Sequence, residues 1–233
     1  MKIQVYSDGA SLVEMLEAYK NNKVSGFTTN PTLMKKAGVD NYLEFAKNVL
    51  EKITDMPISF EVFSDDFEEM YDQAKKLASL GSNVYVKIPV TNTSRAFSGD
   101  LINRLDKENV KMNITAVFTE DQVKSILQNI NTDNPHIISI FAGRIADTGV
   151  DPIDIMKNSL DMIKAHNKNL KLLWASPREV LNVYQAEQIG CDIITITNPL
   201  LKKLKLKDKN LADYSLETVK MFYDDAKKAG YEL

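Results

Sequence analysis

The segment Val84-Tyr85-Val86-Lys87-Ile88-Pro89-Val90 has the composition of a buried β-strand, yet it carries a lysine. Side chains alternate along a strand, so the valines and Ile88 share one face while Lys87 lies on the other. A strand lysine is commonly an edge residue whose charged head reaches water. The other interpretation is a desolvated amine, partly neutral near pH 7, that attacks a carbonyl as a Schiff-base nucleophile. The segment alone leaves both interpretations open.

Seven further segments resemble this one, and helical stretches separate them, as in a parallel sheet with crossover helices. Their starts are about 27 residues apart, close to the length of one βα unit, and eight units in roughly 250 residues describe a (β/α)8 TIM barrel. We therefore expect an α/β fold with residues 1–233 as a single barrel domain. The predicted strands are Ile3–Asp8, Gly26–Asn30, Ile58–Phe63, Val84–Val90, Met112–Phe118, Ile137–Phe141, Leu170–Ser176 and Ile193–Thr197.

Capping residues predict where several helices begin. Asp40 and Asp65 precede amphipathic stretches, the second of which is expected to end at Gly81. Thr119 and the glutamine three residues later form a capping-box pattern, and Pro177 suits the first turn of a helix.

A last helix, over about 216–228, exceeds what a minimal barrel needs. It is expected either to cover the barrel's side or bottom, or to pack on a neighbouring subunit.

The composition limits the class of protein. The chain has 233 residues, 44% hydrophobic and 26% charged, with a formal net charge of −3. This charge gives no electrostatic reason to expect nucleic acid or an anionic membrane as a partner, and no apolar run approaches the roughly 20 residues of a membrane span. We expect a cytoplasmic protein.

The chain has a single cysteine, Cys191, which excludes an internal disulfide. With only two histidines in addition, a zinc site is not expected. Cys191 is expected to be a small buried residue.

The predicted strands carry an unexpectedly polar second face. The interior of a purely structural barrel is filled by valine, isoleucine and leucine, and each buried polar residue needs a hydrogen-bonding partner. Many of these polar residues lie at the carboxyl ends of their strands, where barrel enzymes build their active sites. On the face of Lys87 we expect Asp8, Thr28, Asn30, Glu61, Asn113, Thr115, Ser139, Ser176, Thr195 and Thr197.

Five motifs lie along these strands: Gly26-Phe27-Thr28-Thr29-Asn30-Pro31-Thr32-Leu33, Val86-Lys87-Ile88-Pro89, Asn113-Ile114-Thr115, Phe141-Ala142-Gly143-Arg144-Ile145 and Ala175-Ser176-Pro177-Arg178. Together they resemble the transaldolase family, specifically its short type, which is related to fructose-6-phosphate aldolase. The resemblance covers nearly the whole chain, although residues 92–99 and 198–210 depart from the family pattern, and Pro177 stands where a bulkier residue is common.

The resemblance implies a catalytic set of four residues. Lys87 attacks the ketone of a ketose phosphate, and Asp8 takes the proton of the C4 hydroxyl as the C3–C4 bond breaks. Glu61 and Thr115 hold the water that shuttles protons. Neither a metal nor another cofactor is implied.

The resemblance also implies the groups that bind substrate. Arg144 and Arg178 are expected to bind the phosphate, since guanidinium groups bind phosphate oxygens bidentately, with Ser176 between them and amide donors after Pro177. The remaining residues expected to line the substrate site are Thr28, Asn30, Asn113, Ser139 and Phe141. The family further implies a homo-oligomer, a pentamer or decamer.

Two reactions remain open within the family. One is transfer of dihydroxyacetone to an aldose, and the other is cleavage that releases it. The short aldolases have glutamine and tyrosine where this chain has Glu61 and Phe141, and Asn113 also fits the transferases, so the sequence favours transfer. Two other interpretations are a sugar-phosphate-binding barrel without catalysis, and an unrelated barrel isomerase that uses Glu61 or Asp8 as base.

Overall fold

The computed structural model describes residues 2–233. Within them the chain forms two compact units, one ending at Leu201 and the other running from Lys202 to Leu233. The first unit is an eight-stranded barrel, and the second contains the last long helix.

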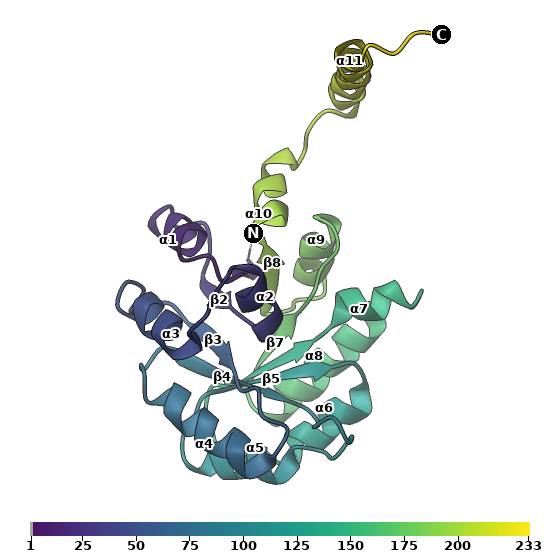
Figure 1. Cartoon of the computed structure of the whole chain (residues 1–233). Helices are drawn as coiled ribbons and strands as arrows, with labels where there is room; N and C mark the ends of the chain where they lie inside the picture. Colours follow the sequence, from purple (N-terminus) through teal and green to yellow (C-terminus); the bar gives the residue numbers. More distant parts are fainter. Residues whose placement is uncertain (1) are drawn as a thin grey trace. The chain divides into compact units, whose positions relative to one another are not determined.

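Eight parallel strands form a closed barrel in sequence order (Figure 1). The predicted fold class is therefore confirmed, and every predicted strand is present, although seven of the eight are shorter than expected. Because the sheet closes, β4 is not an edge strand, and the edge interpretation of Lys87 is wrong. The strands are β1 (Gln4–Asp8), β2 (Gly26–Thr28), β3 (Ile58–Glu61), β4 (Val84–Pro89), β5 (Met112–Val117), β6 (Ile137–Ile140), β7 (Lys171–Trp174) and β8 (Ile193–Thr197).

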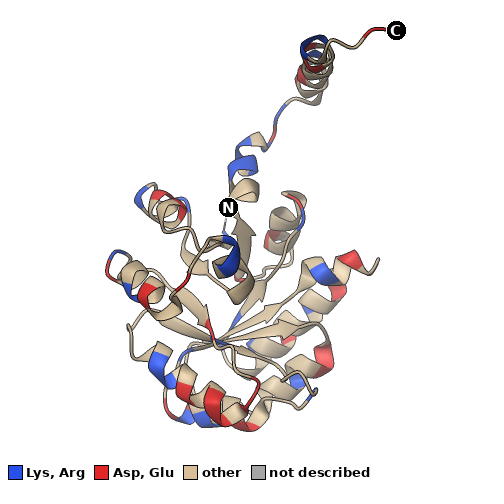
Figure 2. Cartoon of the chain, viewed as in Figure 1, with Lys and Arg blue, Asp and Glu red and all other residues tan. Residues whose placement is uncertain are grey.

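Helices connect successive strands outside the barrel (Figure 1). Charged residues lie mainly on these helices, whereas the strands are almost free of them (Figure 2). The helices of the first unit are α1 (Leu12–Lys20), α2 (Pro31–Lys36), α3 (Tyr42–Leu50), α4 (Phe67–Ala78), α5 (Gly99–Lys107), α6 (Glu120–Leu127), α7 (Ala142–Asp147), α8 (Ile153–His166) and α9 (Leu181–Gln188). α10 (Asn198–Lys203) follows β8.

The barrel interior changes character along its length. One layer is apolar and buried, with Tyr6, Ile137, Leu173 and Ile193 in one cluster. Burying side chains of this size stabilises the fold by about 1.5–3 kcal/mol each. At Gly26 a β-carbon would lie 2.6 Å from the Tyr6 ring, so only glycine fits beside this layer. The barrel interior thus has an apolar layer below the polar side chains at the carboxyl ends of the strands.

Two predicted helix caps are displaced by one residue. Asp66, not Asp65, caps α4, because the Asp65 carboxylate instead accepts hydrogen bonds from the backbone N–H and hydroxyl of Thr93. Likewise Asn41, not Asp40, caps α3 through its side-chain oxygen. In both places neighbouring residues offered equivalent oxygens, and at α4 the contact of Asp65 with Thr93 decides which one caps.

Two other helix boundaries differ from the prediction. Pro177 does not open a helix, because the Asn182 side chain accepts from the backbone N–H groups of Arg178 and Glu179 and holds a turn before α9 begins. α4 ends at Ala78, before Gly81. The capping box of Thr119 with Gln122 is confirmed at the start of α6. Cys191 is buried, as expected.

A buried polar cluster lies at the start of β5 and β6, the end of the barrel remote from the polar layer. His136 Nδ1 accepts from the Met112 backbone N–H at 3.0 Å, so its proton is on Nε2, 2.8 Å from the Asp106 carboxylate. Burial lowers the pKa of His136. Burial raises the pKa of Asp106, but hydrogen bonds from His136, Thr132 and the Asn131 backbone outweigh it and hold the pKa below its usual value. This cluster ties two strands to the helix between β4 and β5.

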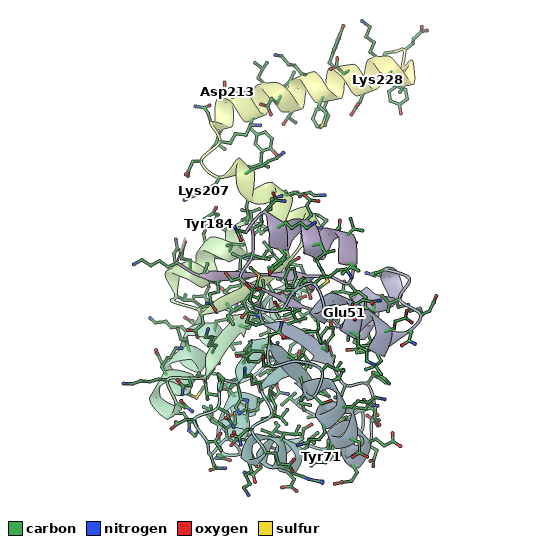
Figure 3. All side chains as sticks on the ribbon, turned by 90° about the vertical axis from the view of Figure 1, so that its left-hand side faces the viewer. Glu51, Tyr71, Tyr184, Lys207, Asp213 and Lys228 are labelled. Carbon is green, nitrogen blue, oxygen red and sulfur yellow. The ribbon has the colours of Figure 1, made fainter. Side chains whose placement is uncertain are left out.

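The second unit contains a short 3-10 helix (Leu204–Leu206) and α11 (Leu211–Ala229). α11 is longer than the predicted helix over about 216–228, because Asn210 caps its start and Gly230, in the left-handed conformation, caps its end. Side chains project from all sides of α11 between Asp213 and Lys228 (Figure 3). Among residues 2–233, no helix is both long and apolar enough to cross a membrane.

Candidate active site

One cavity of about 520 Å³ opens among the polar residues at the carboxyl ends of the strands. It contains side chains from strands on every side of the barrel. Its lining brings together all twelve residues expected at the site: Asp8, Thr28, Asn30, Glu61, Lys87, Asn113, Thr115, Ser139, Phe141, Arg144, Ser176 and Arg178. Thr197, expected on the same face, is exposed and does not belong to the lining that the structure describes.

Lys87 is a buried cation in the lining of the cavity. Its side chain is only 7% exposed, and Nζ lies 2.9 Å from Oε2 of Glu61 on the neighbouring strand. Nζ also donates to the carbonyl oxygen of Thr29 at 3.0 Å. A buried ammonium needs such partners, because an unpaired charge in a protein interior is costly. The pair places an amine and a proton acceptor next to each other inside the cavity.

Asp8 ends β1 and faces the same space. Thr28 donates to its Oδ1 at 2.7 Å, and the Thr28 hydroxyl is also bonded to Thr195. Burial raises the pKa of the Asp8 carboxyl, and although Lys87 and the Thr28 hydrogen bond act in the opposite direction, the pKa stays above its usual value. A carboxylate with a raised pKa is a stronger base than an ordinary aspartate, which suits proton abstraction.

The side chain of Asn113 is fixed by a buried chain of hydrogen bonds. Its amide nitrogen donates to the Ser59 hydroxyl at 3.0 Å, and its oxygen accepts from the Ser139 hydroxyl at 2.6 Å. Ser59 was not predicted at the site, although it precedes Glu61 by two residues and therefore shares its face of β3; it does not line the cavity and contacts the site through Asn113. One amide hydrogen of Asn113 and the lone pairs of Ser139 remain to meet a ligand hydroxyl.

Thr115 and Ala116 both line the cavity, which strict strand alternation does not allow. The register between β5 and β6 shifts between Ile114 and Val117, and Ala116 has a positive φ of 59°, as in a β-bulge. The buried Thr115 hydroxyl has no hydrogen-bond partner among the described residues. A buried hydroxyl is normally satisfied by protein or water, so it marks a place for a bound water or ligand oxygen.

The expected phosphate-binding residues meet where α7 approaches the end of β7. A β-carbon on Gly143 would lie 1.6 Å from the Ser176 carbonyl oxygen, so this approach requires glycine. The guanidinium of Arg178 is held bidentately by the Asp147 carboxylate, with Nε 2.9 Å from Oδ1. Hydrogen bonding to Arg178 lowers the pKa of Asp147. Arg144 has no carboxylate partner among the described residues.

Phe141 lies just beyond β6, not within it as expected, and precedes the first residue of α7. Its ring contacts the Phe118 ring, with centroids 5.7 Å apart, and the Arg144 guanidinium lies 5.3 Å from its centroid. Phe141 thus presents an apolar wall to the cavity.

Asn30 and Lys36 line the opposite side of the cavity, on or next to α2. The Asn30 oxygen caps α2 by accepting from the Leu33 backbone N–H at 2.9 Å, which leaves its amide hydrogens for a ligand. Lys36 was missed, because a lysine in a helical stretch gives no signal of its own. The other lining residues not predicted are Pro31, Thr32, Leu33, Ala116, Leu173 and Ala175.

Comparison with known proteins identifies the family. The family model described as "Transaldolase/Fructose-6-phosphate aldolase" matches residues 5–233. The chain belongs to the transaldolase/fructose-6-phosphate aldolase family. A probable transaldolase of Thermoanaerobacter sp. (strain X514) is 32% identical over 231 residues, which is 99% of this chain and the full length of that protein. One from Thermoplasma volcanium is 34% identical over 87% of each chain.

Solved structures similar to this transaldolase-family chain support the fold alone. Dihydrodipicolinate synthase from Rhodopseudomonas palustris superposes with a TM-score of 0.60 at 13% identity, over 92% of this chain and 78% of its own. In the described part of the chain, no group of three or more His, Cys, Asp or Glu side chains is arranged to hold a metal ion. The family assignment and the barrel fold predicted from the sequence are therefore confirmed, while the roles of individual site residues remain predictions.

Proposed function

We propose that this chain transfers a dihydroxyacetone unit from a ketose phosphate, such as fructose 6-phosphate or sedoheptulose 7-phosphate, to an aldose phosphate through a Schiff base on Lys87. The observation that carries the proposal is the Lys87–Glu61 pair, 2.9 Å apart inside the cavity. A buried amine beside a proton acceptor is what imine formation needs. An isomerase would not require the amine to be accessible to a carbonyl carbon.

Imine formation begins with a proton transfer. Lys87 gives a proton to Glu61, and its free electron pair attacks the C2 ketone of the sugar to form a carbinolamine. Glu61 then protonates the departing hydroxyl, so water leaves and an iminium ion forms. Thr115, whose hydroxyl has no described partner, supports the proposal as a holder of the water that relays these protons.

Carbon–carbon cleavage needs a base at the C4 hydroxyl. In the proposal Asp8 takes this proton, the C4–O pair becomes the carbonyl of the leaving aldehyde, and the C3–C4 electrons move into the iminium to give an enamine. The acceptor aldehyde then reacts with the C3 carbon, and Asp8 returns the proton to the new hydroxyl. Hydrolysis of the new iminium releases the product and restores Lys87.

The enamine must survive until an acceptor arrives. Phe141 offers no proton donor, and its ring packs on Phe118 at the cavity wall. Protonation of the enamine would instead lead to release of dihydroxyacetone, which is the cleavage reaction. Phe141 therefore favours transfer over cleavage.

Substrate binding is assigned by hydrogen-bonding capacity. Asn30, Asn113 and Ser139 keep donors or acceptors free for the hydroxyls of the three-carbon unit. Arg144, Ser176 and Arg178 are proposed to bind the sugar phosphate, whose charge-assisted hydrogen bonds to guanidinium groups are strong. The Thr28 hydroxyl orients Asp8.

The proposal is tested with fructose 6-phosphate, with and without erythrose 4-phosphate, measuring sedoheptulose 7-phosphate and free dihydroxyacetone. Borohydride added with the donor should attach a dihydroxyacetone-sized mass to the native chain. Lys87→Arg should lose both turnover and labelling, because a guanidinium does not form the imine. A chain that binds the sugar without labelling would be a binding protein or an isomerase, and one that releases dihydroxyacetone as fast as it transfers it would be an aldolase.

Assembly forms a separate part of the proposal. α11 exposes large apolar side chains, including Leu211, Val219, Phe222 and Tyr223. We propose that residues 1–233 form one barrel domain whose last helix packs on a neighbouring copy, giving a homo-oligomer such as a pentamer or decamer. Removal of residues 208–233 should reduce the mass measured by light scattering to that of smaller species. An unchanged mass would mean that α11 covers its own barrel instead.

A further inference from the structure

Tyr42, the first residue of α3, makes two hydrogen bonds with one residue of the catalytic pair. Its hydroxyl accepts from the Glu61 backbone N–H at 2.7 Å and donates to the Glu61 carbonyl oxygen at 2.8 Å. Its ring is held against Phe60 and Phe63, with centroids 6.4 Å and 5.5 Å away. A single hydroxyl therefore satisfies both backbone groups of the last residue of β3.

The need for this hydroxyl follows from where β2 ends. The bonds between β2 and β3 recur every second residue: Phe27 N–H donates to the Pro57 carbonyl, and Thr29 N–H to the Ser59 carbonyl. The next donor in this series is residue 31, which is a proline without an N–H. The carbonyl of Glu61 thus has no strand partner, and the Tyr42 hydroxyl takes the place of the missing one.

The same hydroxyl leaves the Thr29 carbonyl free for Lys87. In a continuing ladder the Glu61 N–H would donate to Thr29, but Tyr42 accepts this hydrogen bond instead. The Thr29 carbonyl oxygen instead accepts a hydrogen bond from Lys87 Nζ at 3.0 Å, and the same Nζ lies 2.9 Å from the Glu61 carboxylate. Both members of the pair thus depend on one phenolic oxygen.

We propose that Tyr42 is a positioning residue that sets the geometry of proton transfer between Glu61 and Lys87, an inference that rests on the proposed function. Without the hydroxyl, the Glu61 N–H competes with Lys87 for the Thr29 carbonyl, and the end of β3 loses its lateral support. A displacement of about 1 Å at reacting groups can reduce the rate by about a hundredfold. Substrate binding, which uses other residues, is affected much less.

The test is Tyr42→Phe, which removes the hydroxyl and keeps the ring between its aromatic neighbours. We expect kcat for transfer and the rate of borohydride labelling to fall together by about 10- to 100-fold, with KM within about threefold of the native value. Tyr19→Phe is the matched control, because Tyr19 donates its hydroxyl to Asp55 at 2.8 Å outside the cavity. It should leave both rates unchanged. Circular dichroism and thermal unfolding establish that each variant is folded.

A double substitution separates positioning from general support of the fold. If Tyr42 acts through Glu61, Tyr42→Phe should cause little further loss in a Glu61→Gln chain. Losses that multiply in the double variant, or native kcat and labelling in Tyr42→Phe, would overturn the inference while leaving Schiff-base transfer intact. Native protein that forms no adduct at all would overturn both.

Discussion

The two arginines of the cavity are predicted to contribute unequally to phosphate binding. Arg144 has no carboxylate partner among the described residues, so its whole guanidinium is available to a phosphate. Arg178 is held by Asp147 through Nε and one terminal nitrogen, which leaves the other terminal nitrogen free. Arg144→Ala removes the phosphate contact and the contact with the Phe141 ring, whereas Arg178→Ala removes the phosphate contact and also deprives the Asp147 carboxylate of its ion-pair partner.

The expected magnitudes follow from this difference. Loss of one hydrogen-bonded charge pair costs about 1.5–3 kcal/mol, so Arg144→Ala should raise KM for fructose 6-phosphate by roughly 10- to 100-fold with kcat nearly unchanged. Arg178→Ala should cost at least as much, because the freed Asp147 carboxylate repels the phosphate. Arg178→Ala with Asp147→Asn should recover part of this loss.

Steady-state kinetics with matched substrates provide the measurement. Fructose as donor and erythrose as acceptor carry no phosphate, so their kcat/KM should change by less than about threefold in each variant. Equal losses for phosphorylated and unphosphorylated substrates would refute the reasoning and assign Arg144 and Arg178 to support of the fold. An additive effect of Asp147→Asn would likewise contradict the repulsion argument.

Three further outcomes are expected. Phe141→Tyr should release more dihydroxyacetone and transfer less to erythrose 4-phosphate, measured as a product ratio on one preparation, since the new hydroxyl can protonate the enamine; an unchanged ratio would contradict this role. Because the pKa of Asp8 is raised and its ionised form is the base, kcat/KM should rise with pH through a value above that of an ordinary aspartate, and Asp8→Asn should lose this limb along with most activity. Asp106→Asn should lower the free energy of unfolding at pH 7 by about 1.5–3 kcal/mol, because the hydrogen bonds to the buried carboxylate lose their charge. The pKa of Asp106 is lower in the folded state than in the unfolded state, so its stabilisation is present when the pH is above the unfolded-state pKa and is lost as the pH falls through the folded-state pKa. Denaturant titrations of native and variant protein should therefore converge in acid.

The fold and the strand residues of the cavity lining were predictable from strand alternation, whereas Arg144 and Arg178 were expected from the family resemblance. Each strand buries one apolar face against the helices, so polar residues on the other face had to point into the barrel. The lysine of β4 and the carboxylates of β1 and β3 were therefore identified together. The registers of β3 with β4 and of β4 with β5 place Glu61, Lys87 and Asn113 side by side across three strands.

What could not be predicted depends on the ends of elements. The role of Tyr42 follows from the point at which β2 stops, and that of Ser59 from a contact to Asn113 on β5, beyond the intervening β4. The pairing of Arg178 with Asp147 joins the segment after β7 to the last residue of α7, 31 residues away in the sequence. Such tertiary contacts produce no periodic pattern in the sequence from which they could be predicted.

The bulge in β5 is another feature that strand alternation does not predict, and it affects the proposed chemistry. An extra residue near Ala116 breaks the alternation at the cavity rim, and Ala116 and Ser176 both adopt the left-handed conformation without being glycine. Each such residue costs on the order of 1 kcal/mol, which the surrounding barrel must offset. In return Thr115 and Ala116 both line the cavity, and Ser176 brings its carbonyl against Gly143 beside Arg144. The strain thus lies at the two strand ends where the proposed water-binding and phosphate-binding groups have to be turned toward the substrate.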